Sequence, residues 1–503
     1  VSAPVSVDGG QGHKRISLAT TAPEARLFTV SPSGNLRLEK IDLLGGLARG
    51  VSGNPEGRGG AVLALGSFSL FSGSIVGAKA VGFAGGVQPG GAKGGAIYAE
   101  SDLHLFQATV SGNVAEGGSG NTSTGQPVTG PSAGGGIFVS SPAGNHLAIL
   151  ELSTIADNSA NTGAGMAVLP PTSAAVGAGA SLRVDISGSV LADNKGGSDA
   201  EMVPGGSTQF VTFTVTQSFA ETLGQFLAGT GFTIGETGLG PRSSASASPV
   251  HRPTDGSPLI GAVTSNTSFI DQTGAQRFQP TAAGAAEYYT APDDISLSNK
   301  EFPAAFPAGA SIGKLSASGI FAGFSFDFAL VPGVVDNARF QVQGNELRTA
   351  PGYEHTPGST YLVRIRATGV TGLSFEKELS ILAKADIVVD TAADIVDPAD
   401  GKTSLREAIA AAALSAGPDN ISFDPGLAGA TLSVGEDPNL PGTAFFVTSE
   451  IQISGENSPG LVIRPQPGKN IRLFQVSYAT PLGLREITLA GGRAIDGPGG
   501  AIL

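Results

Sequence analysis

Cysteine and tryptophan are absent from the sequence, and charged residues are few. Without cysteine the chain has no disulfide bridge, thiolate metal ligand or cysteine nucleophile. Charged residues make up 14% of the 503 residues, against a usual ~25%. No apolar run reaches the ~18 residues of a membrane-spanning helix, so membrane insertion is not expected. The formal net charge of −13 argues against a nucleic acid as a partner.

Glycine, by contrast, is present in excess. The chain has 75 glycines, about twice the usual ~7%. Its hydrophobic content of 40% is enough for a large core, so a disordered chain is not expected. A prior of ~150 residues per domain suggests about three domains.

An internal repeat links the two ends of the sequence. The segment Arg26–Ser31 recurs as Arg472–Ser477, 446 residues later, and 12 of the 23 positions from Arg26 to Ala48 are identical in the second segment. Residues 447–503 therefore begin a second copy of residues 1–63, with a six-residue deletion after which Gly59–Leu63 corresponds to Gly499–Leu503. We expect a natural unit of about 446 residues, with both ends of this chain inside a structural unit. A fibre, stalk or long surface protein needs such copies, whereas an enzyme seldom does.

Residues 1–240 contain short alternating strands separated by glycine and asparagine. Several strands are followed by an asparagine, namely Asn113, Asn158 and Asn194. A unit that recurs every ~30–45 residues is typical of a solenoid of stacked coils. In such a stack each asparagine can bond to its equivalents above and below. We therefore predict a structural role for these three residues. The region resembles a right-handed parallel β-helix of the pectin-lyase-like kind.

Residues 241–290 contain Asp271-Gln272 followed by Arg277, then Gly284-Ala285 and Glu287. This pattern resembles the choice-of-anchor Q ending found after bacterial extracellular β-helices. Because an open parallel edge would pair with another chain, we expect this segment to cover the last coil.

Residues 291–385 contain strands with aromatic and β-branched residues, spaced as in a sandwich. Their order resembles a cadherin-like repeat, a family that binds calcium through carboxylates at module junctions. Calcium requires six or more oxygen ligands, and Glu354 alone keeps a matching carboxylate here. We therefore expect a cadherin-like β-sandwich spacer, with Glu354 as a weak calcium candidate.

Residues 386–446 carry the most specific motif. A turn with Asp397 and Asp400 precedes Ser404-Leu405-Arg406-Glu407-Ala408. Ser404 and Glu407 form a capping box, which predicts a helix over about 404–416. The motif resembles the CSLREA-type domain of repetitive bacterial surface proteins, with Thr403 at the cysteine position. The expected helix, with Ile409 and Leu414 on one face, would cap the first coil of the next solenoid (447–503), and the Asp397–Asp400 turn is a second weak metal candidate.

The resemblance to pectin-lyase-like solenoids keeps an enzyme in consideration, because many of them cleave polysaccharides. Hydrolysis requires two carboxylates that face each other at ~5–9.5 Å. Asp157 and Asp193 precede equivalent asparagines and could lie close together, but we expect them to be corner residues. No histidine pair has metal-ligand spacing; the five histidines are His13, His104, His146, His251 and His355.

The sequence thus favours a mainly β fold: a right-handed parallel β-helix, a β-sandwich of the cadherin or immunoglobulin kind, and a short capping helix. We expect a non-catalytic structural repeat module of a giant extracellular or cell-surface bacterial filament, without a cofactor. Its partners would be further copies, head-to-tail, and surface glycans if it is adhesive. A polysaccharide lyase or hydrolase and a carbohydrate-binding adhesin module remain the alternatives. Sugar binding would need exposed aromatic rings, and we expect Phe68, Phe71 and Phe106 to lie in the core.

Overall fold

A computed structural model describes residues 1–503 apart from 19–24, 226, 228, 244–247, 266–267, 320–324, 335, 370–371, 416 and 495–496. The protein is mainly β, with 44% of its residues in strands and 5% in helices. It divides into two compact units, Val1–Tyr289 and Thr290–Leu503, which are described separately.

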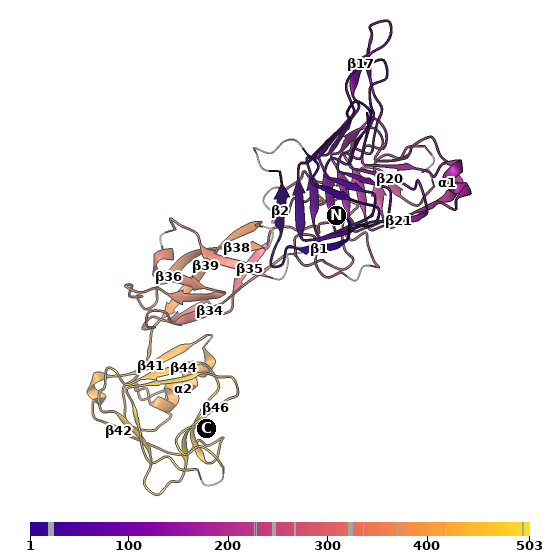
Figure 1. Ribbon diagram of the computed structural model, residues 1–503. Coiled ribbons are helices and arrows are strands. Elements are labelled where there is room, and N and C mark those ends of the chain that lie inside the picture. The colour runs from indigo at the N-terminus through magenta and orange to yellow at the C-terminus, as the bar shows by residue number, and fades with distance from the viewer. Residues whose placement is uncertain are drawn as a thin grey trace. The chain divides into compact units, whose positions relative to one another are not determined.

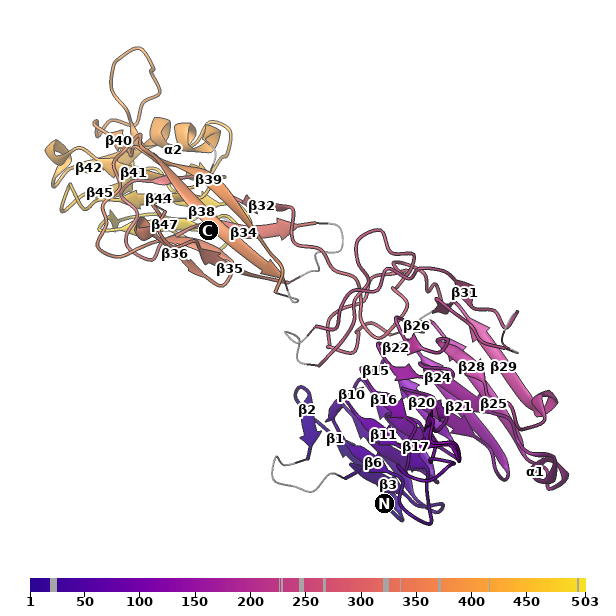
Figure 2. The same ribbon diagram turned by 90° about the horizontal axis from the view of Figure 1, so that it is seen from above.

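The first unit is a parallel β-solenoid, as the sequence predicts (Figure 1, Figure 2). Three long sheets run along it, and each of the first six coils adds one strand to each sheet. Sheet 1 contains β1 (Pro4–Asp8), β4 (Asn35–Glu39), β9 (Ser67–Phe71), β14 (Leu103–Phe106), β21 (Asn145–Glu151), β25 (Ser181–Ser187) and β29 (Val211–Thr216). Sheet 2 contains β2 (Lys14–Ser17), β5 (Ile41–Leu44), β10 (Ser74–Val76), β15 (Thr109–Ser111), β22 (Thr154–Ala156), β26 (Val190–Ala192), β30 (Phe219–Ala220) and β31 (Thr233–Ile234). Sheet 3 contains β3 (Phe28–Val30), β8 (Val62–Ala64), β13 (Ile97–Ala99), β20 (Ile137–Ser140), β24 (Met166–Leu169) and β28 (Ala200–Met202).

Smaller elements complete the coils. Two short parallel sheets contain β6 (Leu47–Arg49), β7 (Gly57–Arg58), β11 (Lys79–Val81), β12 (Ala92–Lys93), β16 (Val114–Glu116), β19 (Ser132–Ala133), β23 (Ser159–Ala160) and β27 (Lys195–Gly196). The antiparallel hairpin β17 (Ser119–Asn121) and β18 (Pro127–Thr129) projects from the coils, and α1 (Ser173–Gly177) is a short helix (Figure 1). Backbones approach closely between coils: a Cβ on Gly95 would lie 2.0 Å from the carbonyl oxygen of Gly135.

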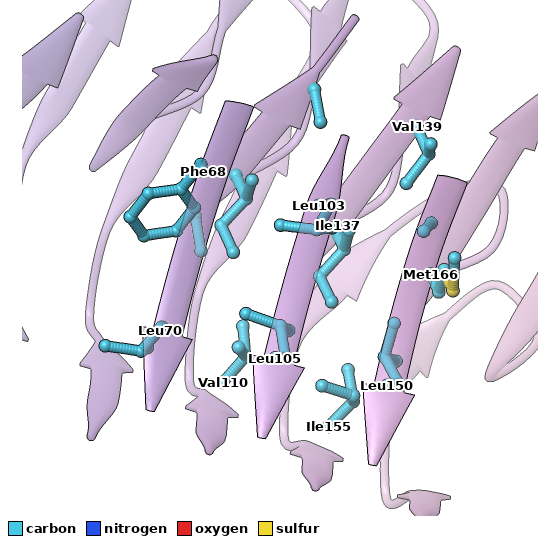
Figure 3. Close-up of a cluster of buried hydrophobic side chains, with 14 of the residues drawn as sticks. Phe68, Leu70, Leu103, Leu105, Val110, Ile137, Val139, Leu150, Ile155 and Met166 are labelled. Atoms are coloured by element: carbon cyan, nitrogen blue, oxygen red, sulfur yellow. The ribbon is translucent and has the colours of Figure 1, made fainter. Parts of the chain in front are cut away.

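The alternating pattern of each strand places every second side chain in one continuous core. Phe68, Leu103 and Ala148 occupy the same register position in successive coils and are buried. Figure 3 shows Phe68, Leu70, Leu103 and Leu105 pointing into this core. Because each coil covers the apolar face of the last, the core extends along the stack rather than forming a single centre.

The expectation of a core position was wrong for two of the three phenylalanines. Phe68 is fully buried, but Phe71 and Phe106 lie at half-buried positions on the outer face of sheet 1. Phe68 differs from Phe71 by an odd number of residues, and successive strand side chains alternate between the two faces. The outer face of sheet 1 therefore carries aromatic rings.

The segment 248–289, here called the strap, also departs from expectation. Its described contacts place it along the outer face of sheet 2, not across the last coil. Leu259, Val263 and Ala283 of the strap pack against Leu152 and Val190 of the solenoid. Near the last coil, Leu227 and Phe232 pack against the solenoid core. The strap follows sheet 2 because its polar groups meet those that the sheet presents outward, as described below.

The second unit begins with two four-stranded sheets, paired mostly antiparallel, that share one core. One contains β32 (Asp294–Leu297), β34 (Ser311–Ser318), β36 (Phe340–Gln343) and β37 (Glu346–Thr349), and the other contains β33 (Glu301–Pro303), β35 (Phe326–Leu330), β38 (Thr360–Gly369) and β39 (Ser374–Lys384). Parallel coils follow, with β40 (Ile387–Val389), α2 (Leu405–Leu414), β41 (Asp419–Phe423), β42 (Thr431–Val434), β43 (Thr443–Val447), β44 (Ile451–Ser454), β45 (Val462–Pro465), β46 (Arg472–Val476), β47 (Leu482–Arg485) and β48 (Thr488–Leu489).

Helix α2 starts where the capping box predicts. The amide of Glu407 donates to Ser404 Oγ at 3.2 Å, and the amide of Ser404 donates to Glu407 Oε2 at 2.8 Å. Ile409 is buried, but Leu414 is 92% exposed, so the expectation of a shared face was wrong. Five residues correspond to about 500° of helical rotation, which leaves the two side chains ~140° apart. The helix ends at Leu414, and residue 416 lies outside the described residues.

Candidate functional site

The structure stacks the three predicted asparagines into a ladder at the corner that follows sheet 2. The side-chain amide of Asn113 donates to Asn158 Oδ1 at 2.9 Å, and that of Asn158 donates to Asn194 Oδ1 at 3.0 Å. Each side-chain amide also donates to a carbonyl of the preceding coil, at Ile75, Val110 and Ile155 respectively. Asn113 and Asn158 are completely buried. The ladder thus satisfies backbone groups that the turn leaves unpaired.

Asp199 ends the ladder, a role that no pattern in the sequence indicated. Its Oδ1 accepts from the Asn194 side chain at 2.8 Å, and its Oδ2 accepts from the amides of Glu221 and Thr222. Burial raises the pKa of Asp199, while the bonds from Asn194 and Thr222 oppose that rise. The carboxylate replaces the asparagine that a further coil would have supplied.

Asp157 and Asp193, which the sequence suggested could lie close together, occupy equivalent corner positions. Both have the left-handed backbone conformation, with φ of 58° and 57°. Burial, followed by the charges of Glu221 and Asp157, raises the pKa of Asp193. The left-handed backbone conformation favours a short polar residue such as aspartate. The local backbone therefore explains why aspartate stands at both corners.

The strap is held to sheet 2 by a seam of buried polar side chains. His251 Nδ1 donates to the carbonyl of Gly240 at 2.9 Å, so its Nε2 accepts from the Ser111 hydroxyl at 2.8 Å. Thr109 donates to Gln272 Oε1 at 2.7 Å. The amide of Ala285 donates to the Thr154 hydroxyl at 2.9 Å. These strap contacts reach strands β15 and β22.

Asp42 on β5 is the furthest node of this seam. Its Oδ1 accepts from Ser74 at 2.7 Å and from Ser248 of the strap at 2.5 Å. His13 Nδ1 lies 3.6 Å from the same oxygen, and His13 Nε2 donates to the carbonyl of Gln272 at 2.8 Å. All these side chains except Ser248 come from the first three coils. Because Leu259, Val263 and Ala283 of the strap pack against Val190 of β26, the strap spans from β5 to β26.

The residues of the choice-of-anchor Q-like pattern hold the strap together internally. Arg277 is fully buried, donates to the carbonyls of Ala282, Gly284 and Ala285, and lies 3.6 Å from Glu287. Asp271 pairs with Arg252 at 3.1 Å. Burial lowers the pKa of Arg277 and raises that of Glu287. These ionisable groups therefore pair with each other and with backbone groups of the strap.

A Ser–His contact of this kind could in principle activate a serine hydroxyl. Ser111 is completely buried, however, and His251 is 2% exposed. Arg242 Nη1 also lies 3.2 Å from Ser111 Oγ. Because the strap covers this face of sheet 2, a polysaccharide has no access to the pair.

The outer face of sheet 1 groups aromatic, basic and acidic side chains. The guanidinium of Arg37 lies 3.7 Å from the ring centroid of Phe71, and His104 meets Phe71 edge-to-face at 4.9 Å. His104 Nε2 lies 3.1 Å from Glu151 Oε2. Phe106 and Glu151 also line a cavity of about 160 Å³ beside the strap. Aromatic rings beside hydrogen-bonding groups are suited to sugars as well as to a protein surface.

Of the three weak metal candidates, Asp397 and Asp400 use a carboxylate oxygen in a local turn. Asp397 Oδ1 accepts from the amide of Ala399 at 3.0 Å, and Asp400 Oδ1 accepts from the amide of Lys402 at 2.8 Å. Glu354 is exposed, and its carbonyl accepts from an arginine side chain at 2.9 Å. Within the described residues no group of three or more histidine, aspartate or glutamate side chains is arranged to hold a metal ion.

Arg406 stands inside the Ser404–Ala408 motif and joins several segments, a role that the sequence pattern did not indicate. Its guanidinium binds both carboxylate oxygens of Asp394, at 2.9 and 2.8 Å. It also donates to the carbonyls of Ala444 and Gly435 and lies 5.0 Å from the ring centroid of Phe445. One side chain thereby joins the helix to three separate segments of its coil.

The two copies of the repeat adopt the same local structure. In the first, the amides of Leu27 and Phe28 both donate to the carbonyl of Ala61; in the second, those of Leu473 and Phe474 both donate to the carbonyl of Ala501. The bridge between Phe28 and Val62 recurs between Phe474 and Ile502, as the aligned sequences require. Lys40 and Glu486, also equivalent, both have φ of 53°.

No helix among the described residues is long and apolar enough to cross a membrane. Comparisons with protein-family models, with curated proteins and with solved structures each find no match for this chain.

Proposed function

We propose that this chain is a non-catalytic structural repeat module of a bacterial extracellular or cell-surface filament. The observation that carries the proposal is the repeated coil: residues 1–63 and 447–503 share sequence, register and turn geometry 446 residues apart. A stack of coils is quasi-one-dimensional and stiff, and each coil contacts only its neighbours. Length and stiffness are the properties that a filament requires.

The remaining parts fit this role. The two sheets of residues 294–384 serve as a cadherin-like sandwich spacer between solenoids. Helix α2, whose Leu405, Ala408 and Ile409 are buried against the coil that follows, acts as the capping helix of a CSLREA-type segment. The strap corresponds to the choice-of-anchor Q ending. Further copies of the unit, head-to-tail, are the expected partners.

Electron microscopy of the native surface material tests this proposal. We expect a filament in which solenoid and spacer alternate with the period of one 446-residue unit. Isolated monomers without periodic order would overturn the filament. Cleavage of uronans or other polysaccharides by the purified chain would overturn the non-catalytic assignment.

A carbohydrate-binding module is the second candidate, because Phe71, His104 and Phe106 are grouped on the outer face of sheet 1. Glycan-array binding that is lost in Phe71→Ala and Phe106→Ala, but kept when the exposed Val87 of a distant loop is changed to Ala, would favour this function. Equal glycan binding by all these variants would assign Phe71 and Phe106 to packing alone.

A further inference from the structure

A groove with a largely apolar lining lies beside helix α2 in the second unit and is here called the α2 groove. It has a volume of about 390 Å³. Its apolar lining consists of Val396, Ile409, Ala410, Ala413, Phe445 and Phe446. Two of these side chains face solvent, since Val396 is 67% exposed and Phe446 is 39% exposed. Apolar side chains that are exposed together around a hollow are typical of an interaction site.

The volume of the α2 groove sets the size of what can enter it. A cavity of ~150 Å³ holds one benzene molecule. A volume of about 390 Å³ therefore admits roughly two large apolar side chains. An amphipathic helix presents its apolar side chains in this way, at positions i and i+3 or i+4, when it binds a groove.

The segment that forms the α2 groove is strongly acidic. Residues 386–446 contain ten acidic and two basic residues, so they carry −8 of the chain's net charge of −13. Both basic side chains are paired: Lys402 Nζ lies 3.3 Å from Asp390 Oδ2, and Arg406 Nη2 lies 2.8 Å from Asp394 Oδ2. The charge of this segment therefore favours a positively charged partner.

Three carboxylates stand beside the residues that line the α2 groove. Asp397 directly follows Val396, Asp400 belongs to the same turn as Asp397, and Glu436 directly precedes Asp437, a polar lining residue. Asp397, Asp400 and Glu436 are exposed, and within the described part of the chain they form no ion pair. They can therefore pair with the basic side chains of a ligand.

We infer that the α2 groove binds a basic amphipathic segment of another protein. One or two of its apolar side chains enter the groove, and its lysine or arginine side chains face Asp397, Asp400 and Glu436. A second copy of this chain is a poor occupant, because its net charge has the same sign. The inference is independent of the filament proposal, since it concerns one segment of one chain.

Fluorescence anisotropy with the full chain and a labelled synthetic peptide tests this inference. The probe is a helical peptide of about 18 residues, with leucines at i, i+3, i+4 and i+7 and lysines on either side of them. In one control peptide glutamate replaces every lysine, and in the other serine replaces every leucine. We expect the leucine–lysine peptide to bind at least about tenfold more tightly than either control, and its affinity to fall as salt is added.

Substitutions at exposed positions locate the binding site. Val396→Ser and Phe446→Ser should each weaken binding by about tenfold or more, as expected for an anchoring contact. Leu362→Ser is the matched control, because Leu362 is 48% exposed on β38 of the sandwich. Asp397→Asn should weaken binding by about two- to fivefold, whereas Asp327→Asn, at an exposed position on β35, should leave it unchanged.

Amide exchange of the unsubstituted chain gives a second measurement that does not depend on a variant's stability. The leucine–lysine peptide should slow exchange in α2 and β43 but not in β38. Unchanged exchange in α2 and β43 overturns the inference.

The other outcomes separate the alternatives. No binding of the leucine–lysine peptide, or equal binding of the glutamate peptide, overturns the inference. Equal binding of the serine peptide, or full binding by Phe446→Ser, would show attraction by charge alone and also overturns it. In sedimentation, a dimer of this chain that Phe446→Ser dissociates would assign the α2 groove to a second copy instead.

Discussion

Removing one rung of the asparagine ladder is the most direct perturbation of the solenoid. Asn158→Ala leaves three buried groups without their partner: the amide of Asn113, its side-chain NH₂ hydrogen, and the carbonyl of Val110. Each buried unsatisfied group costs about 1–3 kcal/mol. Asn113 is completely buried, so water does not replace the lost hydrogen bonds there. Allowing for partial relaxation, we expect the free energy of opening this corner to fall by roughly 3–4 kcal/mol.

The loss should be local, because a solenoid coil interacts only with its neighbours. Amide hydrogen exchange of peptides from β15 and β22 measures it, and the expected change is an acceleration of about 100- to 1,000-fold, at 1.4 kcal/mol per tenfold. Asn161→Ala is the control, since Asn161 is exposed in the same coil and should change by less than ~0.5 kcal/mol. Equal effects of the two variants would refute the argument that the ladder stabilises the stack.

Arg406→Met should destabilise the coil around α2 by about 3 kcal/mol, because it leaves the buried Asp394 carboxylate unpaired, whereas Arg364→Met at a solvent-exposed pair should cost below ~1 kcal/mol. Chemical unfolding, monitored by amide hydrogen exchange in α2, compares the two variants. Ser404→Ala should cost about 1–2 kcal/mol in the same assay, and no loss would contradict the capping role. Burial lowers the pKa of His251 below its unfolded value of ~6.5, so the unfolded chain binds the extra proton as the pH falls below that value. Strap stability should therefore decline from about pH 7 to about pH 5, as measured by thermal unfolding of the first unit, and His251→Gln should flatten the decline.

The coil architecture could be predicted from the sequence because its signals are local and repeated. A strand, a glycine and Asn113, Asn158 or Asn194 recur at each corner, and stacking follows from that recurrence. The capping box at Ser404 and Glu407 is equally local, and helix α2 begins there. The placement of Leu414 was wrong because five residues do not return to the same helical face.

The strap could not be placed in the same way. Its partners are far away along the chain: Ser248 and Asp42 are separated by 206 residues, and His251 and Ser111 by 140. No local pattern specifies which outward polar side chain of a sheet a distant loop will meet. The outward position of Phe71 likewise depended on which face of its strand the core occupied. The apolar character of phenylalanine alone favours a buried position.

The amino-acid sequence by itself determined that this chain forms stacked parallel coils, because strands, glycines and asparagines recur at short intervals. It also determined that the same coil is built twice, because the segment repeats after 446 residues. Tertiary structure alone decided that the strap covers sheet 2 and that aromatic rings lie on the outer face of sheet 1. These features depend on which surfaces meet across long stretches of chain, and burial of distant polar and apolar groups selects among arrangements that local patterns leave equivalent.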